Sequence, residues 1–257
     1  MTTYADPRFL VCALGPELPR LLAAARSFSA ATAFVPDEEF SSADADDRME
    51  RSFGVCWDTV AANAHDASDE AAVADHGAVM YSLSAQLPQV AALTGAIDAV
   101  NFIEHLLDHG ATAVKIENAG IAHGALRWHA LASDLRRARD AGDRVALART
   151  ARIAVTKRPL GGERYYESLG NHMVGLPEVY VPIKAVRTDR DAVRVMEEVA
   201  DELVIDGLDA VLARRGATLD PVSPYEGDFE FKINPYGIVK LAATPLLPGV
   251  RPSRPGL

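Results

Sequence analysis

The stretch from Arg164 to Ile183, RYYESLGNHMVGLPEVYVPI, most constrains the fold because its residues suit neither a plain helix nor a plain loop. Aromatic and β-branched residues, which favour strands, stand on both sides of Gly170-Asn171 and of Gly175-Leu176-Pro177. Glycine and proline at such points mark turns. The stretch therefore predicts two short strands that meet at a fixed junction, whose polar side chains are Asn171, His172 and Glu178.

The charge of the chain narrows the classes of partner. The 257 residues include 26 basic and 36 acidic side chains, which gives a net charge of −10. Such a chain repels the phosphate backbone, so we expect no nucleic-acid partner. The N-terminus has neither the basic nor the apolar region of a signal peptide, and no run has the length of a membrane span. We therefore expect a cytoplasmic protein without membrane contact.

A strand–helix–strand unit occupies the middle of the first half. Gly77–Ala85 reads as a strand, Leu93–His109 as a helix with apolar residues at helical spacing, and Ala111–Ile116 as a returning strand. A crossover of this length favours parallel strands. Upstream, the pattern indicates a strand and a helix followed by an apolar run: Arg8–Leu14, Glu17–Ser27 and Ala31–Val35.

The second half shows a related alternation of strands and helices. After an arginine-rich helix over Ala125–Ala141, the partial alternation in Asp143–Lys157 predicts a strand that pairs with the Tyr165 region. The remaining predicted elements are a strand, a helix and the two arms of a hairpin: Glu178–Lys184, Thr188–Ile205, Asp228–Ile233 and Ile238–Ala243.

These elements predict an α+β fold, in which a mixed sheet has helices packed on it. Residues 1–244 form one domain, with 1–142 and 143–244 as its halves, and residues 245–257 form an extended, proline-rich tail. Two ferredoxin-like halves that share a sheet fit the pattern, and so does one duplicated α+β domain.

Two segments carry a resemblance to a known family. In Thr94–Leu131 a helix leads through GATAV to the turn Glu117-Asn118-Ala119-Gly120, and in Tyr165–Asp206 an aromatic strand precedes Gly175-Leu176-Pro177-Glu178. Together they resemble an uncharacterised bacterial domain-of-unknown-function family. The resemblance covers roughly a third of the chain. It implies a compact α+β fold and an association of some members with secretion or toxin systems, and it supplies no catalytic residues.

Polar residues at two turns are the candidate site. Glu117, Asn118 and His123 follow a predicted strand, where clefts form in parallel α/β sheets, and His172 and Glu178 flank the later turn. A carboxylate and an imidazole within reach of each other could act as a general acid–base pair. The structural alternative is that these residues only shape and pack the turns.

Two histidines at helical spacing raise the question of a metal. His105 and His109 are four residues apart, so two imidazoles could share an ion. The glutamate that follows the first histidine in zinc proteases is replaced here by Leu106. We therefore favour an exposed polar stripe over a metal site, and no motif indicates another cofactor.

Two charged segments have both a plain and a functional interpretation. Residues 37–50 contain seven acids and one arginine, which predicts a solvated loop or a ragged helix start. Residues 134–158 contain eight basic residues and three aspartates. The plain interpretation is a solvated helix face, and the functional one is a docking surface for an acidic protein or a nucleotide.

The absence of common catalytic motifs in the sequence favours a binding function. There is no Walker loop, dinucleotide fingerprint, nucleophile elbow or zinc-protease motif. We expect a non-enzymatic protein that binds another protein, as an immunity or accessory factor of a toxin or secretion system. The alternative is an acid–base enzyme that uses the glutamates and histidines of the two turns.

Overall fold

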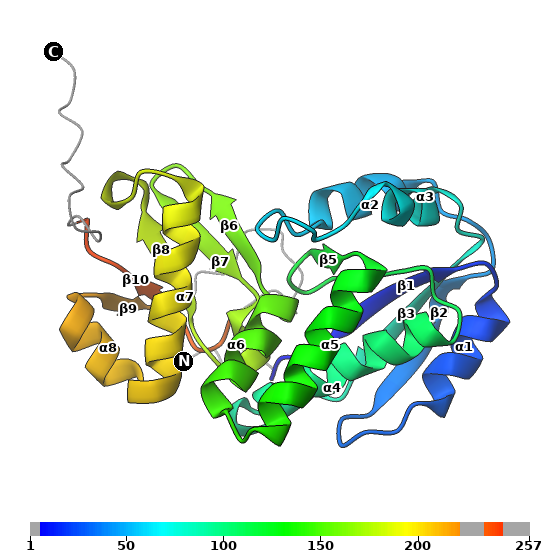
Figure 1. Ribbon diagram of the computed structural model, residues 1–257, viewed down its shortest axis with the longest axis horizontal. Coiled ribbons are helices and arrows are strands. Elements are labelled where there is room, and N and C mark those ends of the chain that lie inside the picture. Colours follow the sequence, from blue (N-terminus) through cyan, green and yellow to red (C-terminus); the bar gives the residue numbers. More distant parts are fainter. Residues whose placement is uncertain (1–5, 222–233, 244–257) are drawn as a thin grey trace, which may run out of the picture.

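The chain folds into two five-stranded β-sheets, each with helices packed against it (Figure 1). The computed structural model describes residues 6–221 and 234–243. The predicted α+β class is confirmed. The strands form two separate sheets, however, where the sequence pattern was compatible with a single shared one.

The first sheet has the strand order of a ferredoxin-like fold with a fifth strand added. The order is β2-β3-β1-β4-β5, and every ladder between these strands is antiparallel. Helix α1 (Leu18–Ser27) joins β1 to β2, and α4 (Gln89–Asp108) joins β3 to β4, which gives the β-α-β-β-α-β succession with two helices inserted between β2 and β3. The strands are β1 Leu10–Gly15, β2 Phe34–Ser42, β3 Ala78–Ser84, β4 Ala113–Ile116 and β5 Ile121–His123.

Strands β3 and β4, which α4 connects, run parallel to each other as predicted, but they do not pair because β1 lies between them. Cys12 on β1 stands opposite Tyr81 on β3 and opposite Lys115 on β4, and both ladders are antiparallel. The strand LVCALG is apolar along its length and buried on both faces. A strand of this kind gains most from the centre of a sheet, where both of its faces are covered.

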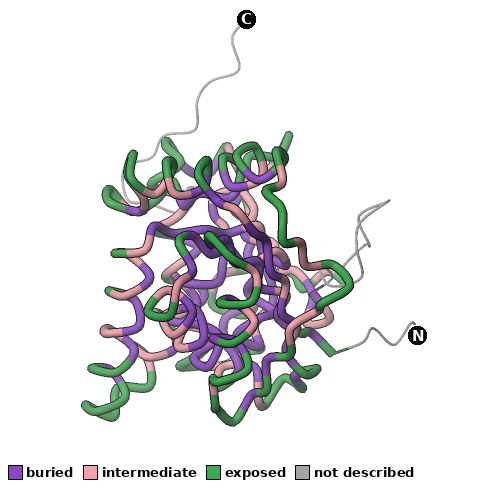
Figure 2. Tube along the Cα trace, turned by 90° about the vertical axis from the view of Figure 1, so that its right-hand side faces the viewer, coloured by how far each residue is buried: buried purple, intermediate pink, exposed green. Residues whose placement is uncertain are grey.

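The larger hydrophobic core lies between one face of this sheet and four helices: α1, α4, α5 (Ala125–Asp140) and α6 (Arg144–Val155). Figure 2 shows the buried residues gathered in the interior. By length and composition alone α4 could cross a membrane, but 56% of its most apolar window is buried inside the fold. The apolar residues of α4 therefore contribute to the hydrophobic core.

The opposite face of the first sheet carries a smaller core under α2 (Arg48–Cys56) and α3 (Ala67–Ala74).

The acidic segment 37–50 is therefore not simply a loop. Its first part continues β2 as far as Ser42, and its last residues begin α2. Strand β2 is the edge strand of the sheet, where acidic side chains stay in water and do not oppose strand formation.

The strand predicted within Asp143–Lys157 is wrong, because this segment forms α6. Its buried residues include Ala148, Ala151, Arg152 and Val155, which follow the helical spacing of three and four. The side chain of Asp143 accepts a hydrogen bond from the Ala146 amide and caps the helix. The strand itself, β6, begins only at Lys157, and it does pair with the Tyr165 region.

The second sheet has the order β6-β7-β8-β10-β9 and a different succession of elements. Three consecutive strands are followed by α7 (Asp189–Asp206) and α8 (Leu208–Arg215), and β8 and β10 are parallel. The ferredoxin-like order is thus found in the first sheet only. The strands are β6 Lys157–Gly161, β7 Tyr165–Leu169, β8 Glu178–Pro182, β9 Thr218–Asp220 and β10 Ile238–Lys240.

Two predicted segments fall wholly or largely on residues that the structure does not describe. The first arm of the predicted hairpin, Asp228–Ile233, lies outside the described residues, as does the tail 245–257. Its second arm contains β10, which pairs with β8 and β9.

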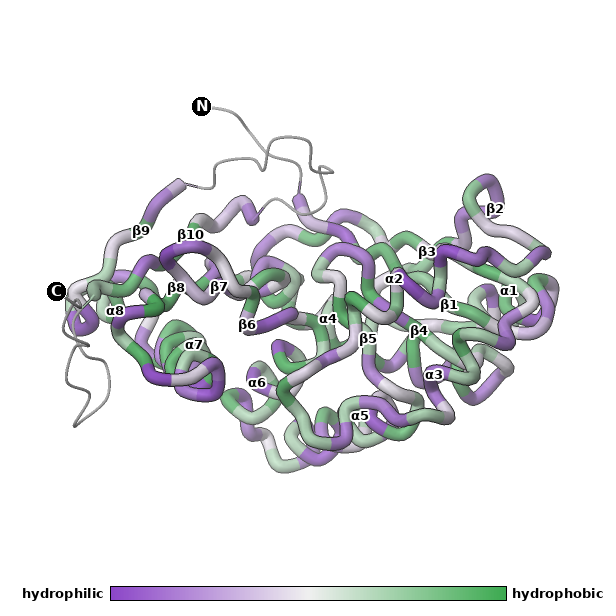
Figure 3. The backbone as a smooth tube through the Cα atoms, turned by 90° about the horizontal axis from the view of Figure 1, so that it is seen from above, coloured by the Kyte–Doolittle hydropathy of each residue, from purple (hydrophilic) through white to green (hydrophobic). Residues whose placement is uncertain are grey.

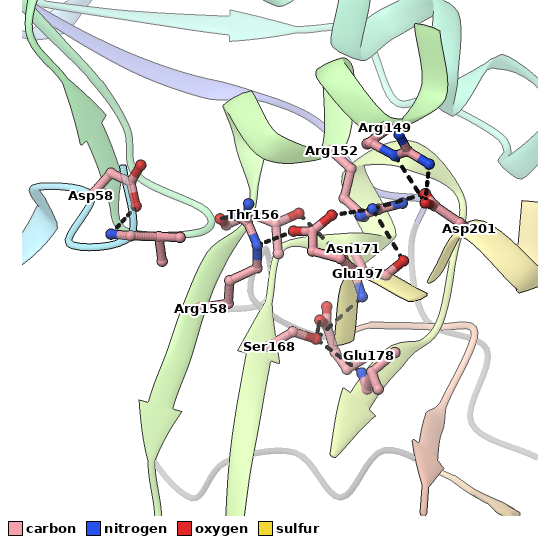
Figure 4. A network of polar contacts seen from close by, with 12 residues as sticks. Asp58, Arg149, Arg152, Thr156, Arg158, Ser168, Asn171, Glu178, Glu197 and Asp201 are labelled. Carbon is pink, nitrogen blue, oxygen red and sulfur yellow. Dashed lines mark hydrogen bonds and ion pairs between the residues drawn. The ribbon is translucent and has the colours of Figure 1, made fainter. Parts of the chain in front are cut away.

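A network of ion pairs joins α6, which packs on the first hydrophobic core, to α7, which packs on the second (Figure 4). Seen from above, α5, α6 and α7 line one side of the molecule across both sheets (Figure 3). Arg152 of α6 is only 2% exposed and pairs with Glu197 and, at 3.1 Å, with Asp201 of α7. Arg149 also pairs with Asp201, and Arg158 of β6 pairs with Glu197. Two carboxylates of α7 thus hold three guanidinium groups, two from α6 and one from β6.

We expect Arg152→Ala to lower the free energy of unfolding by about 2–4 kcal/mol, because it leaves partly buried carboxylates beside the cavity of the lost side chain. Urea unfolding measures the change. The control is Arg136→Ala, which removes a surface pair with Glu104 at 2.5 Å and is expected to cost less than about 1 kcal/mol. Equal losses for the two variants would contradict the role given to Arg152.

Candidate functional site

The junction between β7 and β8 is organised by one buried carboxylate. Oε2 of Glu178 accepts a hydrogen bond from the Ser168 hydroxyl at 2.6 Å. Oε1 accepts from the Gly170 amide and from the Asn234 side chain, both at 3.0 Å, and lies 3.3 Å from Nδ1 of His172. Since donors surround both oxygens, Glu178 holds the turn together and has little capacity left for a ligand.

Asn171 completes this buried network (Figure 4). Its side-chain amide donates to Ser168 Oγ at 3.2 Å and to the Pro177 carbonyl at 3.1 Å, and its oxygen accepts from the Thr156 hydroxyl at 3.2 Å. The one-turn 3-10 helix η1 (Asn171–Val174) is buried throughout. The polar residues that the sequence suggests as a site are therefore enclosed in the fold.

Polar side chains at the earlier turn are also enclosed in the fold. Asn118 is fully buried, and its Oδ1 accepts a hydrogen bond from the Leu10 amide at 2.6 Å. His123 is also buried, with Nε2 3.2 Å from the Ala154 carbonyl and Nδ1 3.6 Å from Asp58. Glu117 of this group lines a cavity, and its carboxylate pairs with Lys115 at 2.8 Å.

The two turns nevertheless lie against each other. Gly170 has a φ of +113°, and a Cβ built on it would lie 2.7 Å from the Ala119 Cβ and 2.6 Å from the Val155 carbonyl. Only glycine fits such a close approach in this conformation. The structure therefore brings the two predicted turns together through their backbones, while Asn118, His123, His172 and Glu178 stay buried.

The two histidines at helical spacing are engaged in local contacts. The rings of His105 and His109 lie 4.1 Å apart, His105 Nε2 is 3.0 Å from the Ala24 carbonyl, and His109 Nδ1 is 2.8 Å from the His105 carbonyl. Within residues 6–221 and 234–243, no three His, Cys, Asp or Glu side chains form a group that could hold a metal ion.

The basic segment 134–158 is largely neutralised by acids of the same chain. Five of its arginines form ion pairs with carboxylates, among them Arg136 with Glu104 and Arg137 with Asp134. Lys157 donates to the backbone carbonyls of Val55 and Trp57. This segment is therefore mainly a structural element, and a basic docking surface has little support.

An open groove on the face of the first sheet that carries α2 and α3 is the feature that the sequence did not indicate. It consists of two adjoining hollows of about 860 and 690 Å³. Both hollows are lined by Leu10, Phe40, Arg48 and Tyr81. The second extends to β6, which faces α2 in Figure 1. Phe40 of β2 and Val55 of α2 line this groove while 71% and 70% exposed.

Tyr81, which lines both hollows, stands beside two buried residues of the neighbouring strands. Cys12, Tyr81 and Lys115 are cross-strand neighbours on β1, β3 and β4. Lys115 pairs with Glu117, hydrogen-bonds Ser52 and lies 5.3 Å from the centre of the Phe53 ring. Burial raises the pKa of the Cys12 thiol to about 12 and also raises the pKa of Tyr81. Both groups therefore stay neutral, and the cysteine supplies no thiolate nucleophile.

The rim of the larger hollow is acidic. Asp37, Asp46 and Asp47 line it together with Arg8 and Arg48. The guanidinium of Arg48 forms hydrogen bonds with Asp46, including one of 2.7 Å, and these lower the pKa of Asp46 to about 2. The charges of Arg48 and Asp46 thus cancel. The remaining charged residues of the rim are the acids Asp37 and Asp47 and the basic Arg8.

Comparison with protein-family models, curated protein sequences and solved structures found no match to this chain. The resemblance to an uncharacterised bacterial family stays a prediction. The groove itself could have been suspected from two signals: an unaccompanied aromatic, Phe40, within an acidic segment, and the alternation that puts Cys12 and Tyr81 on one face of their strands.

We expect Gly170→Ala to destabilise the fold by about 2–4 kcal/mol, because the new methyl group meets Ala119 and Val155 in a left-handed backbone conformation. Thermal or urea unfolding measures the loss. Gly142→Ala is the matched control: its φ is +65°, and nothing lies within 4 Å of the added Cβ, so about 1 kcal/mol is expected. Similar losses at both positions would argue against close contact of the two turns.

The buried His123 predicts a pH dependence of stability. Burial lowers its pKa from 6.5 to about 4, against a smaller opposite effect of Asp58. Because the unfolded chain takes up the proton first, the stabilisation is complete above about pH 7 and decreases as the pH falls from 6.5 towards 4. We expect a loss of about 2 kcal/mol between pH 7.5 and pH 5 in urea unfolding. His123→Gln is expected to remove this part of the slope, and an unchanged slope would contradict the assignment.

Proposed function

We propose that the chain is a non-enzymatic, cytoplasmic binding protein that holds a segment of another protein in the groove between β2 and α2. The observation that carries the proposal is the pair of exposed apolar side chains, Phe40 and Val55, beside the two adjoining hollows. The resemblance to a family with members near secretion or toxin systems supports a role as a bacterial immunity or accessory factor.

Exposure of these apolar side chains to water is unfavourable in free energy unless a partner covers them. Burying a phenylalanine or valine side chain contributes about 1.5–3 kcal/mol relative to leaving it in water. Contiguous apolar surface with a polar rim is typical of sites for another protein or a ligand. Here Leu10, Val79 and Leu83 line the larger hollow, and acidic residues surround it. The groove thus combines an apolar centre with a charged edge.

The alternative, an acid–base enzyme, has weaker support. It needs at least two of Glu117, His123, His172 and Glu178 within one open cavity. Three of these four are buried, and Glu117 is paired with Lys115. Tyr81, which lines the groove, and the buried Cys12 opposite it both stay protonated. These observations favour a binding function for this face of the protein over acid–base catalysis.

Site-specific photo-crosslinking in the native host tests the proposal. A photoreactive phenylalanine analogue is placed at position 40, at position 55 or, as a control, at position 126. Leu126 is 80% exposed on α5, away from the groove. We expect one protein to be crosslinked from positions 40 and 55 and not from 126, because only the first two line the groove.

Binding of the purified partner then completes the test. We expect Phe40→Ser to weaken the affinity at least tenfold, since truncation of a central aromatic anchor typically costs about 2 kcal/mol or more, and Leu126→Ser to leave it unchanged. Equal crosslinking from all three positions, or a partner whose affinity is indifferent to Phe40→Ser, would refute groove binding.

A further inference from the structure

We infer that the segment bound in the groove is cationic and carries two bulky apolar side chains, one for each hollow. This inference rests on the proposed function, because it describes what the groove receives. The groove supplies the site, and its charge selects the occupant.

The charge near Phe40 is strongly negative in the folded protein. Residues 37–50 have seven acids against one arginine, a net charge of −6. Glu38 is paired with Arg26, and Asp46 with Arg48. Within the described part of the chain, no basic side chain forms an ion pair with the exposed residues Glu39, Asp44, Asp47 and Glu50. These four carboxylates are available to a partner.

The apolar part of the groove explains why charge alone does not define the partner. The two hollows meet at Leu10, Phe40, Arg48 and Tyr81, so one continuous segment can enter both. Val79 and Leu83 line one of them, and Val55 and Leu160 line the other. Each hollow therefore offers apolar walls to a large side chain such as leucine or phenylalanine, while flanking lysine or arginine residues reach the acids.

The same charge disfavours the other large classes of partner. Nucleic acids and anionic lipid surfaces are both repelled by the free carboxylates of residues 37–50. An acidic protein segment meets the same repulsion. A basic segment is attracted over long range as well, because the whole chain has a net charge of −10. A basic, amphipathic protein segment is the class that fits both the walls and the rim.

A library of random twelve-residue peptides displayed on phage tests this inference without knowledge of the natural partner. The library is selected on the full-length chain, and enriched peptides are synthesised and their affinities measured at low and high salt. We expect enriched sequences with several Lys or Arg residues and two large apolar residues, and affinities that fall as salt rises, because salt screens the attraction.

Charge-matched variants separate local complementarity from overall charge. The groove variant Asp44→Asn/Asp47→Asn/Glu50→Gln removes three exposed carboxylates of residues 37–50, of which Asp47 lines the larger hollow. None of the three has an ion-pair partner among the described residues. The control variant Glu17→Gln/Asp140→Asn/Asp209→Asn removes three exposed acids elsewhere. Since both variants change the net charge equally, we expect at least tenfold weaker peptide binding for the first and less than a twofold change for the second. Circular dichroism verifies that both remain folded.

The outcomes distinguish this inference from the proposed function. Enriched peptides that are neutral or acidic, or an unchanged affinity in the groove variant, overturn the cationic partner and leave groove binding intact. Peptides that bind Phe40→Ser as tightly as the native chain show binding elsewhere and overturn both proposals. Failure to enrich any sequence counts against the inference, because an open groove of this kind binds suitable short segments.

Discussion

The ion network between α6 and α7 is the interaction on which the rest of the structure depends. Helix α6 belongs to the first hydrophobic core and α7 to the second. The orientation of the two cores relative to each other therefore depends on what joins these helices. Arg152 is almost fully buried and connects to both Glu197 and Asp201. A buried guanidinium tolerates few alternative positions, because its charge must stay paired.

The position of the groove follows from this network. Arg158, which pairs with Glu197, lies on β6 next to Lys157, and Lys157 donates to the carbonyls of Val55 and Trp57 at the end of α2. Strand β6 is thus held to α7 on one side and to α2 on the other. The smaller hollow lies between β6 and α2. The contacts that join the two halves therefore also shape the surface that we propose for binding.

Polar residues in this protein divide into two groups with different roles. Glu178, Asn171 and Ser168 satisfy one another in the interior, where an unpaired polar group would be expensive. The acids of residues 37–50 stay largely at the surface, and several have no charged partner among the described residues. Buried residues with catalytic-looking side chains thus stabilise turns, whereas the exposed acids and apolar side chains are available for recognition.

Local patterns in the sequence predicted most elements correctly and failed where two periodicities overlap. The segment RVALARTARIAV alternates enough to suggest a strand, yet Ala148, Ala151, Arg152 and Val155 also share a helical face, and packing selected the helix. The junction around Gly170 was predicted from its glycines and aromatics. The burial of Glu178 there was not, because its partner Asn234 is 56 residues away.

The sequence alone determined the α+β class, the negative charge and the turns at Gly170 and Gly175, because these depend on composition, local periodicity and glycine conformation. Only the tertiary structure decided that β1 would lie between β3 and β4, that the two turns would touch at Ala119, and that Phe40 would stand beside a groove. These features depend on contacts between residues far apart in the chain, and no local pattern specifies which distant surfaces will meet.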